Sequence, residues 1–153
     1  MENSQSNKIK YNSEDMISHH GVAAVIKNER GEVLMQEHIK YGFWIIPVGK
    51  VKENQNVIDG LKQEILEECN LDIEKCNESI VKDYFYQRNG NSVRVTSHLF
   101  EIVRYAGEME NLEPTKHRQQ VFMSVKKITQ LPYLSDLTLL YLHQIGIDRP
   151  ARI

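Results

Sequence analysis

The chain has 153 residues, a formal net charge of -2 and 41% hydrophobic residues, which fits one globular domain and argues against a disordered chain. The near-neutral charge argues against a dedicated nucleic-acid binder, and no apolar run approaches the roughly 20 residues of a membrane helix. Two cysteines, Cys69 and Cys76, are too few for a disulfide framework, so we expect free thiols and a cytoplasmic location.

The N-terminal third predicts a tail followed by three strands. Residues 1–15 are polar throughout, so we expect a flexible tail there and a single domain over residues 16–153. Short apolar runs bounded by turn residues then predict strands at residues 20–26, 32–36 and 42–47. The stretch that follows, residues 49–54, is polar and has no period.

Residues 56–69 change to a helical period. Apolar side chains recur at spacings of three and four and so share one stripe, which consists of Ile58, Leu61, Ile65 and Cys69. Asn56 is the expected N-cap, because its side chain is able to accept a backbone N–H of the first turn. Asn70 is expected to end the helix in a left-handed conformation.

The second half of the chain begins with a predicted hairpin. Two strand-like segments, residues 79–87 and 93–104, flank the strong turn signal Asn89-Gly90-Asn91. Residues 106–119 are polar and predict a loop, and the apolar run at residues 120–125 predicts another strand.

An amphipathic helix is predicted to close the domain over residues 134–145. Ser135 is its expected N-cap, and the inward side chains are expected to be Leu137, Leu140, Tyr141 and Ile145. Helices on both faces of a mixed β-sheet would cover the predicted strands, so the fold class is expected to be α/β in the broad α+β sense.

Three carboxylates on the first helix carry the main functional signal. Glu64, Glu67 and Glu68 stand at positions i, i+3 and i+4, which places them on one helix face. Like charges at this spacing repel one another, and divalent cations such as Mg²⁺ relieve the repulsion because they take carboxylate oxygens as ligands. The alternative is an acidic face in contact with solvent.

Together with the preceding segment, this helix resembles the Nudix hydrolase family. The family's box is a Gly, five residues, a Glu, seven residues, and then Arg-Glu-apolar-any-Glu-Glu-any-Gly-apolar. Its positions are filled here by Gly49, Glu64, Ile65, Glu67, Glu68 and Leu71. Upstream, the sequence GFWIIPVG at residues 42–49 resembles the family's approach to the box. The resemblance implies a Nudix-type α/β/α sandwich with a mixed sheet between helices.

Four positions depart from the family pattern. Gln55 and Gln63 replace a Glu and an Arg that form an ion pair in the family, and we expect the two amides to hydrogen-bond each other instead. Asn70 replaces a Gly but still tolerates a positive φ. Val48 replaces one Gly of the usual pair, where a backbone carbonyl remains available as a metal ligand.

The resemblance implies metal-dependent hydrolysis of a pyrophosphate linkage in a nucleoside diphosphate derivative. A nucleoside triphosphate or a related nucleotide is the favoured substrate. By the resemblance, Mg²⁺ or Mn²⁺ is held by Glu64, Glu67, Glu68 and the carbonyl of Val48. Glu64 and Glu67 are the expected catalytic residues, and whether Glu64 acts as a ligand or as the general base stays open.

Further candidates lie outside the box. A later loop supplies possible acids or bases in Glu113, Glu110 and His117. The candidate substrate contacts are Trp44, Lys50 and Tyr86, although Trp44 fits core packing equally well and Tyr86 fits an ordinary strand position.

The expected partner is a small-molecule nucleotide, with no membrane and no dedicated nucleic-acid binding, in a monomer or a homodimer. The alternative function is a non-catalytic Nudix-fold module that binds a nucleotide and regulates a partner. The three glutamates favour the enzyme.

Overall fold

The computed structural model describes residues 18–148, so the tail predicted over residues 1–15 lies outside the described residues. In chain order the elements are β1 (Ser18–Val25), β2 (Val33–His38), β3 (Trp44–Ile45), β4 (Val48–Lys50), α1 (Val57–Cys69), β5 (Asp72–Arg88), β6 (Asn91–Ala106), β7 (His117–Met123), α2 (Val125–Thr129) and α3 (Asp136–Gln144). None of the helices within the described residues is long and apolar enough to cross a membrane.

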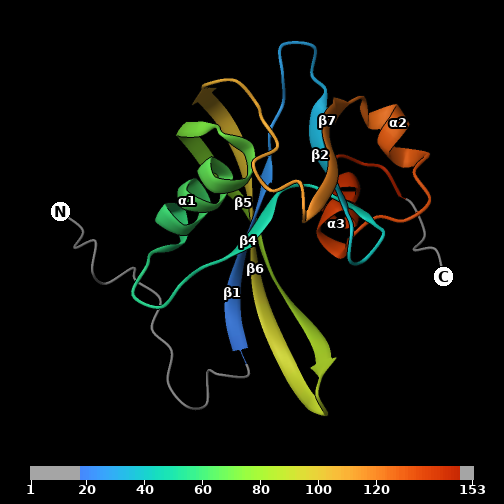
Figure 1. Cartoon of the computed structure of the whole chain (residues 1–153). Coiled ribbons are helices and arrows are strands. Elements are labelled where there is room, and N and C mark those ends of the chain that lie inside the picture. Colours follow the sequence, from blue (N-terminus) through green and yellow to red (C-terminus); the bar gives the residue numbers. More distant parts are fainter. Residues whose placement is uncertain (1–17, 149–153) are drawn as a thin grey trace.

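The strands form two sheets between helices, as Figure 1 shows. A four-stranded sheet has the order β4-β1-β6-β5, and a three-stranded sheet has the order β3-β2-β7. The larger sheet is mixed, because β1 pairs parallel with β6 while its other pairs are antiparallel. Helix α1 covers one face of this sheet, and the smaller sheet with α2 and α3 lies on the other side. The mixed α+β fold is confirmed, with two sheets in place of the single sheet that we expected.

Strand β1 serves both hydrophobic cores, because successive side chains of a strand point to opposite faces. Val22 and Ala24 pack in the core beneath α1. Ala23 and Val25 pack in the second core, against the smaller sheet, α2 and α3. Strand β1 is thereby held by packing on both of its faces. Its neighbour β4 lies next to α1.

Helix α1 has the predicted caps. The Asn56 side chain accepts a hydrogen bond from the Asp59 backbone N–H at 2.7 Å, and Asn70 ends the helix with φ 61°. Leu61, Ile65 and Cys69 are buried as expected. The inclusion of Ile58 in this stripe is wrong, because its side chain is 46% exposed.

The β5–β6 hairpin is longer than predicted. Its turn has the expected residues, with Asn89 at φ 49° and Gly90 at φ 80°, the positive angles that a tight two-residue hairpin turn requires. Strand β5 begins at Asp72 and not at residue 79. Ile73 is buried while charged residues around it face solvent, so the charged outer face hid the strand pattern.

Three smaller differences concern the helices and β4. Strand β4 lies in the segment that we expected to be irregular, and its pairing with β1 supplies the order that its side chains do not encode. The strand predicted over residues 120–125 ends before Ser124, whose side chain caps the start of helix α2. Helix α3 stops at Gln144, so Ile145 is 44% exposed and its predicted inward position is wrong. Ser135 is the N-cap as predicted.

Candidate active site

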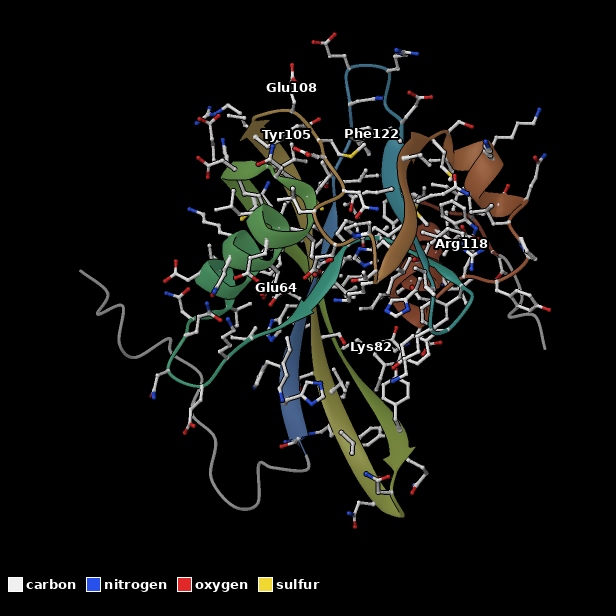
Figure 2. All side chains as sticks on the ribbon, viewed as in Figure 1. Glu64, Lys82, Tyr105, Glu108, Arg118 and Phe122 are labelled. Carbon is white, nitrogen blue, oxygen red and sulfur yellow. The ribbon has the colours of Figure 1, made fainter. Side chains whose placement is uncertain are left out.

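Glu64 of α1 lies directly against the backbone of Gly49 in β4. A Cβ atom placed on Gly49 would overlap Glu64 Cγ and would stand 2.7 Å from its Oε2. Only glycine leaves room for this contact, so the small residue at position 49 lets the carboxylate approach the β4 backbone. Figure 2 shows Glu64 where α1 approaches β4. Burial raises the pKa of Glu64, and the charge of Glu67 raises it further.

Glu68 is buried on the inner side of α1, with only 1% of its surface exposed. Its Oε1 accepts a hydrogen bond from Gln36 Nε2 at 3.3 Å and lies 3.7 Å from His117 Nε2. Its Oε2 lies 3.7 Å from the ammonium of Lys116. Burial raises the pKa of Glu68 to about 8, and the carboxyl group of Glu64 adds to the rise.

The loop between β6 and β7 is tied to the end of α1 by backbone hydrogen bonds. The Leu112 N–H donates to the Glu68 carbonyl at 3.1 Å, and the Glu110 N–H donates to the Cys69 carbonyl at 3.0 Å. The Asn70 side chain donates to the Glu108 carbonyl at 3.2 Å. These bonds hold the loop over the last turn of α1, so its later residues reach Glu68.

Glu68, Glu113 and His117 together form a possible metal-binding group. Each offers a ligand atom, and these atoms lie within 4.8 Å of one another. Glu68 Oε2, Glu113 Oε1 and His117 Nδ1 are buried and have no hydrogen-bond partner among the described residues. Burial lowers the pKa of His117 to about 4, so the ring is neutral near pH 7. Carboxylate oxygens and a neutral imidazole fit a divalent cation such as Mn²⁺.

A buried chain of glutamines orients Glu68, and the sequence did not reveal it. Gln120 Nε2 donates to the Glu110 carbonyl at 3.1 Å, so Gln120 Oε1 is left to accept from Gln36 Nε2 at 2.8 Å. Gln36 Nε2 therefore faces the carboxylate of Glu68. Gln36 stands where the apolar run of β2 gives way to Glu37 and His38, so the sequence carried no signal that its side chain is fully buried.

The two amides that replace the family's ion pair do bond each other, as predicted. Gln55 Nε2 donates to Gln63 Oε1 at 2.5 Å, and Gln63 Nε2 donates to Glu67 Oε1 at 2.9 Å. The Lys52 N–H donates to Gln55 Oε1 at 3.0 Å, which ties the loop into the same chain. Glu67 is exposed but held in place.

A cavity of about 620 Å³ lies next to the site, although the glutamates themselves are not among its lining residues. It lies between β1, β4, the β5–β6 hairpin and the start of α3, and Val48, Gly49, Lys50, Tyr86 and Lys116 are among its lining residues. Gly49 and Lys116 connect it to the site, because they contact Glu64 and Glu68 respectively.

The three candidate substrate contacts differ in their positions. Lys50 and Tyr86 line the cavity, and the Tyr86 hydroxyl donates to Asp136 Oδ2 at 2.9 Å. Trp44 packs against the second core, and its backbone N–H donates to the Tyr133 carbonyl. Trp44 does not line the cavity, so its position fits the packing alternative.

The shifted pKa values of Glu68 and His117 predict how the stability of the metal-free protein depends on pH. The pKa of Glu68 rises from 4.5 to about 8, so its stabilising contribution is full below pH 4.5 and is lost as the pH rises to 8. The pKa of His117 falls from 6.5 to about 4, so its contribution is present above pH 6.5 and is lost as the pH falls.

Between pH 6.5 and 8 the contribution of His117 is constant, so the change in stability comes from Glu68 and from Glu64, whose pKa is also raised. In EDTA, calorimetric melts across this window are expected to show the Tm falling by roughly 5 °C. The variant Glu68→Gln serves as the control and should clearly reduce the slope. A Tm that falls equally in wild type and Glu68→Gln would assign the slope to other groups.

Known proteins resemble this chain in sequence. The model of the NUDIX domain family matches residues 17–139. The 8-oxo-dGTP diphosphatase of Buchnera aphidicola subsp. Schizaphis graminum is 30% identical over 94 residues, which cover 60% of this chain and 68% of that protein. The 8-oxo-dGDP phosphatase of Danio rerio is 28% identical over 88 residues, or 50% of this chain, and the match spans only 27% of that protein.

Solved structures show the same fold. The MutT NUDIX hydrolase from Burkholderia pseudomallei superposes with a TM-score of 0.72 at 22% identity, over 84% of this chain and 98% of that one. The family model extends from β1 to the first half of α3 and so includes every element that builds the site. The chain therefore belongs to the NUDIX domain family.

Proposed function

We propose that this chain hydrolyses a pyrophosphate linkage in a nucleoside diphosphate derivative, with a nucleoside triphosphate or a related nucleotide as substrate and Mg²⁺ or Mn²⁺ as cofactor. The observation that carries the proposal is the close contact of Glu64 with Gly49 beside the buried Glu68, at the edge of a cavity. The names of the two relatives, both phosphatases of oxidised guanine nucleotides, support a nucleotide substrate.

Among the described residues, Glu68, Glu113 and His117 have ligand atoms close enough for one cation, and Glu64 and Glu67 are not part of that group. We assign Glu67 and Glu68 as its ligands together with the carbonyl of Val48, and Glu64 as a further ligand or as the general base. The buried oxygen of Glu68 without a hydrogen-bond partner supports this assignment. When bound, such a cation neutralises phosphate charge and lowers the pKa of a water molecule.

Glu64 is the better candidate for the general base. A base works best with a pKa near the working pH, and burial raises the pKa of Glu64. The pKa of His117 is instead lowered to about 4, so its ring is a weak proton acceptor near pH 7. Glu67 stands beside Glu64 and is held by Gln63. Glu113 and His117 are then assigned to holding Glu68 and the cation from the loop side.

The cavity is assigned to the nucleotide. A volume of about 620 Å³ lies in the range of small-ligand sites. Lys50, next to Gly49, supplies a positively charged side chain for the phosphates, and Tyr86 lies on the hairpin side of the cavity. Trp44 is assigned to the core and not to base stacking.

The bond between Tyr86 and Asp136 predicts a role in substrate selection. Tyr86→Phe keeps the ring and removes the hydroxyl that Asp136 accepts from. Asp136 then loses its partner and presents an unpaired acceptor to the cavity. We expect the KM values of different nucleotides to change unequally, by about 3- to 30-fold, with kcat changed less. Steady-state kinetics on several nucleotides test this, and equal KM values in both proteins would refute it.

The proposed activity is tested with a panel of nucleoside triphosphates, including oxidised guanine nucleotides. Release of phosphate or pyrophosphate is followed with Mg²⁺ and with EDTA. Release that requires the metal and disappears in Glu68→Gln supports hydrolysis. Nucleotide binding without release from any compound would instead identify a binding module.

A further inference from the structure

The ammonium of Lys116 lies between the two carboxylates that face the loop side of the site. Lys116 Nζ is 3.7 Å from Glu68 Oε2 and 3.8 Å from Glu113 Oε1. These separations are those of ion pairs and exceed hydrogen-bond lengths. Both oxygens are buried and have no hydrogen-bond partner among the described residues. Lys116 thus supplies positive charge without satisfying the oxygens, which a divalent cation contacts at about 2.0–2.6 Å.

The backbone of Lys116 is fixed while its side chain has room to move. Its N–H donates to the Glu113 carbonyl at 3.0 Å, and its carbonyl accepts from the Ile39 N–H at 3.0 Å. The side chain is 43% exposed and lines two cavities, the larger one and a smaller one of about 400 Å³ beside His38 and Tyr41. The side chain of Lys116 therefore borders both the carboxylates and the larger cavity while its backbone is held.

We propose that Lys116 is an exchangeable counter-ion of the site: its ammonium neutralises Glu68 and Glu113 until a divalent cation displaces it, and it then binds a phosphate of the nucleotide in the larger cavity. The inference rests on the proposed function. A divalent cation bound to these carboxylates would lie close to the ammonium of Lys116 and repel it, so the two do not occupy the site together. The displaced ammonium gains a partner when a polyphosphate enters, so metal and nucleotide assist each other's binding.

Substitution of Lys116 therefore has opposite effects on the two ligands. Lys116→Met keeps a long side chain and removes the competing charge. Without nucleotide, the Kd for Mn²⁺, measured by electron paramagnetic resonance of the free ion, is expected to fall about tenfold. At saturating metal the KM for the nucleotide is expected to rise about tenfold, with kcat changed less. A purely structural role would weaken both.

Two variants control for charge and shape. Lys116→Arg keeps the charge and is expected to stay near wild type in both quantities. Lys126→Met removes a lysine of α2, away from the site, and is expected to change neither. The inference is overturned if Lys116→Met binds Mn²⁺ no more tightly than wild type, or if its KM is unchanged. In that case the proposed function still stands as long as the wild-type protein hydrolyses the nucleotide. A wild-type protein that neither binds Mn²⁺ nor releases phosphate overturns both.

Discussion

Glu68→Gln is expected to lower kcat by about 10³-fold while leaving the protein at least as stable as wild type. The loss of activity follows from the role that we propose for this buried carboxylate as a metal ligand. The stability follows from the raised pKa of about 8, because an isosteric amide has no charge to desolvate. At pH 7.5 without metal, the gain in unfolding free energy is expected to be on the order of 2 kcal/mol.

The measurements are steady-state kinetics with Mg²⁺ and denaturant unfolding in EDTA. Glu108→Gln is the matched control, because this exposed glutamate lies on the loop that carries Glu113 but outside the site, as Figure 2 shows. The control is expected to keep both activity and stability. Retained activity in Glu68→Gln would remove this carboxylate from the metal site. A clear loss of stability would show that its charge is satisfied in the folded protein.

Gly49→Ala is expected to lower kcat by about 10- to 100-fold, since a displacement near 1 Å at a reacting group has effects of this size. The added methyl group occupies the position of Glu64 Cγ, so the carboxylate has to leave the β4 backbone. Gly49 is not among the glycines with positive φ, so alanine fits the local backbone. Little change in stability is therefore expected, and circular dichroism melts check this.

A double-mutant cycle separates this mechanism from a general disturbance of the cavity. If the methyl group acts only by displacing Glu64, then Gly49→Ala adds nothing once Glu64 is removed. The double variant Gly49→Ala/Glu64→Ala should match Glu64→Ala within about twofold. A further tenfold loss in the double variant would mean that the methyl group acts on the nucleotide cavity, which Gly49 also lines.

Helix α1 was predictable because the residues that indicate it lie close together in the sequence. Asn56, the apolar stripe and Asn70 fix the start, the face and the end of α1 within one stretch of chain. The amide pair Gln55–Gln63 was predictable for the same reason, since the two residues stand eight positions apart. The family resemblance then supplied what spacing alone left open, the function that we propose for the three glutamates.

The loop side of the site was only partly predictable. Glu113 and His117 were candidates by residue type, but Lys116 was not, because its role depends on where the loop lies. That position is set by backbone hydrogen bonds from Glu110 and Leu112 to α1, and such bonds leave no side-chain pattern in the sequence. The buried Gln36 was missed because a polar residue in a short strand is usually exposed.

The length of the β5–β6 hairpin affects how the cavity holds its shape. Strand β1 pairs with β6 only from Arg94 to Glu101, so the outer hairpin is a two-stranded ribbon within the described residues. Tyr86 lies on this ribbon, and its bond to Asp136 is a link across the cavity to α3. The inner part of the hairpin is held by its pairing with β1, and its outer part is held by the hydrogen bond between Tyr86 and Asp136. We therefore expect the width of the cavity to depend on how far the two-stranded part of the hairpin bends and on whether the Tyr86–Asp136 hydrogen bond is made.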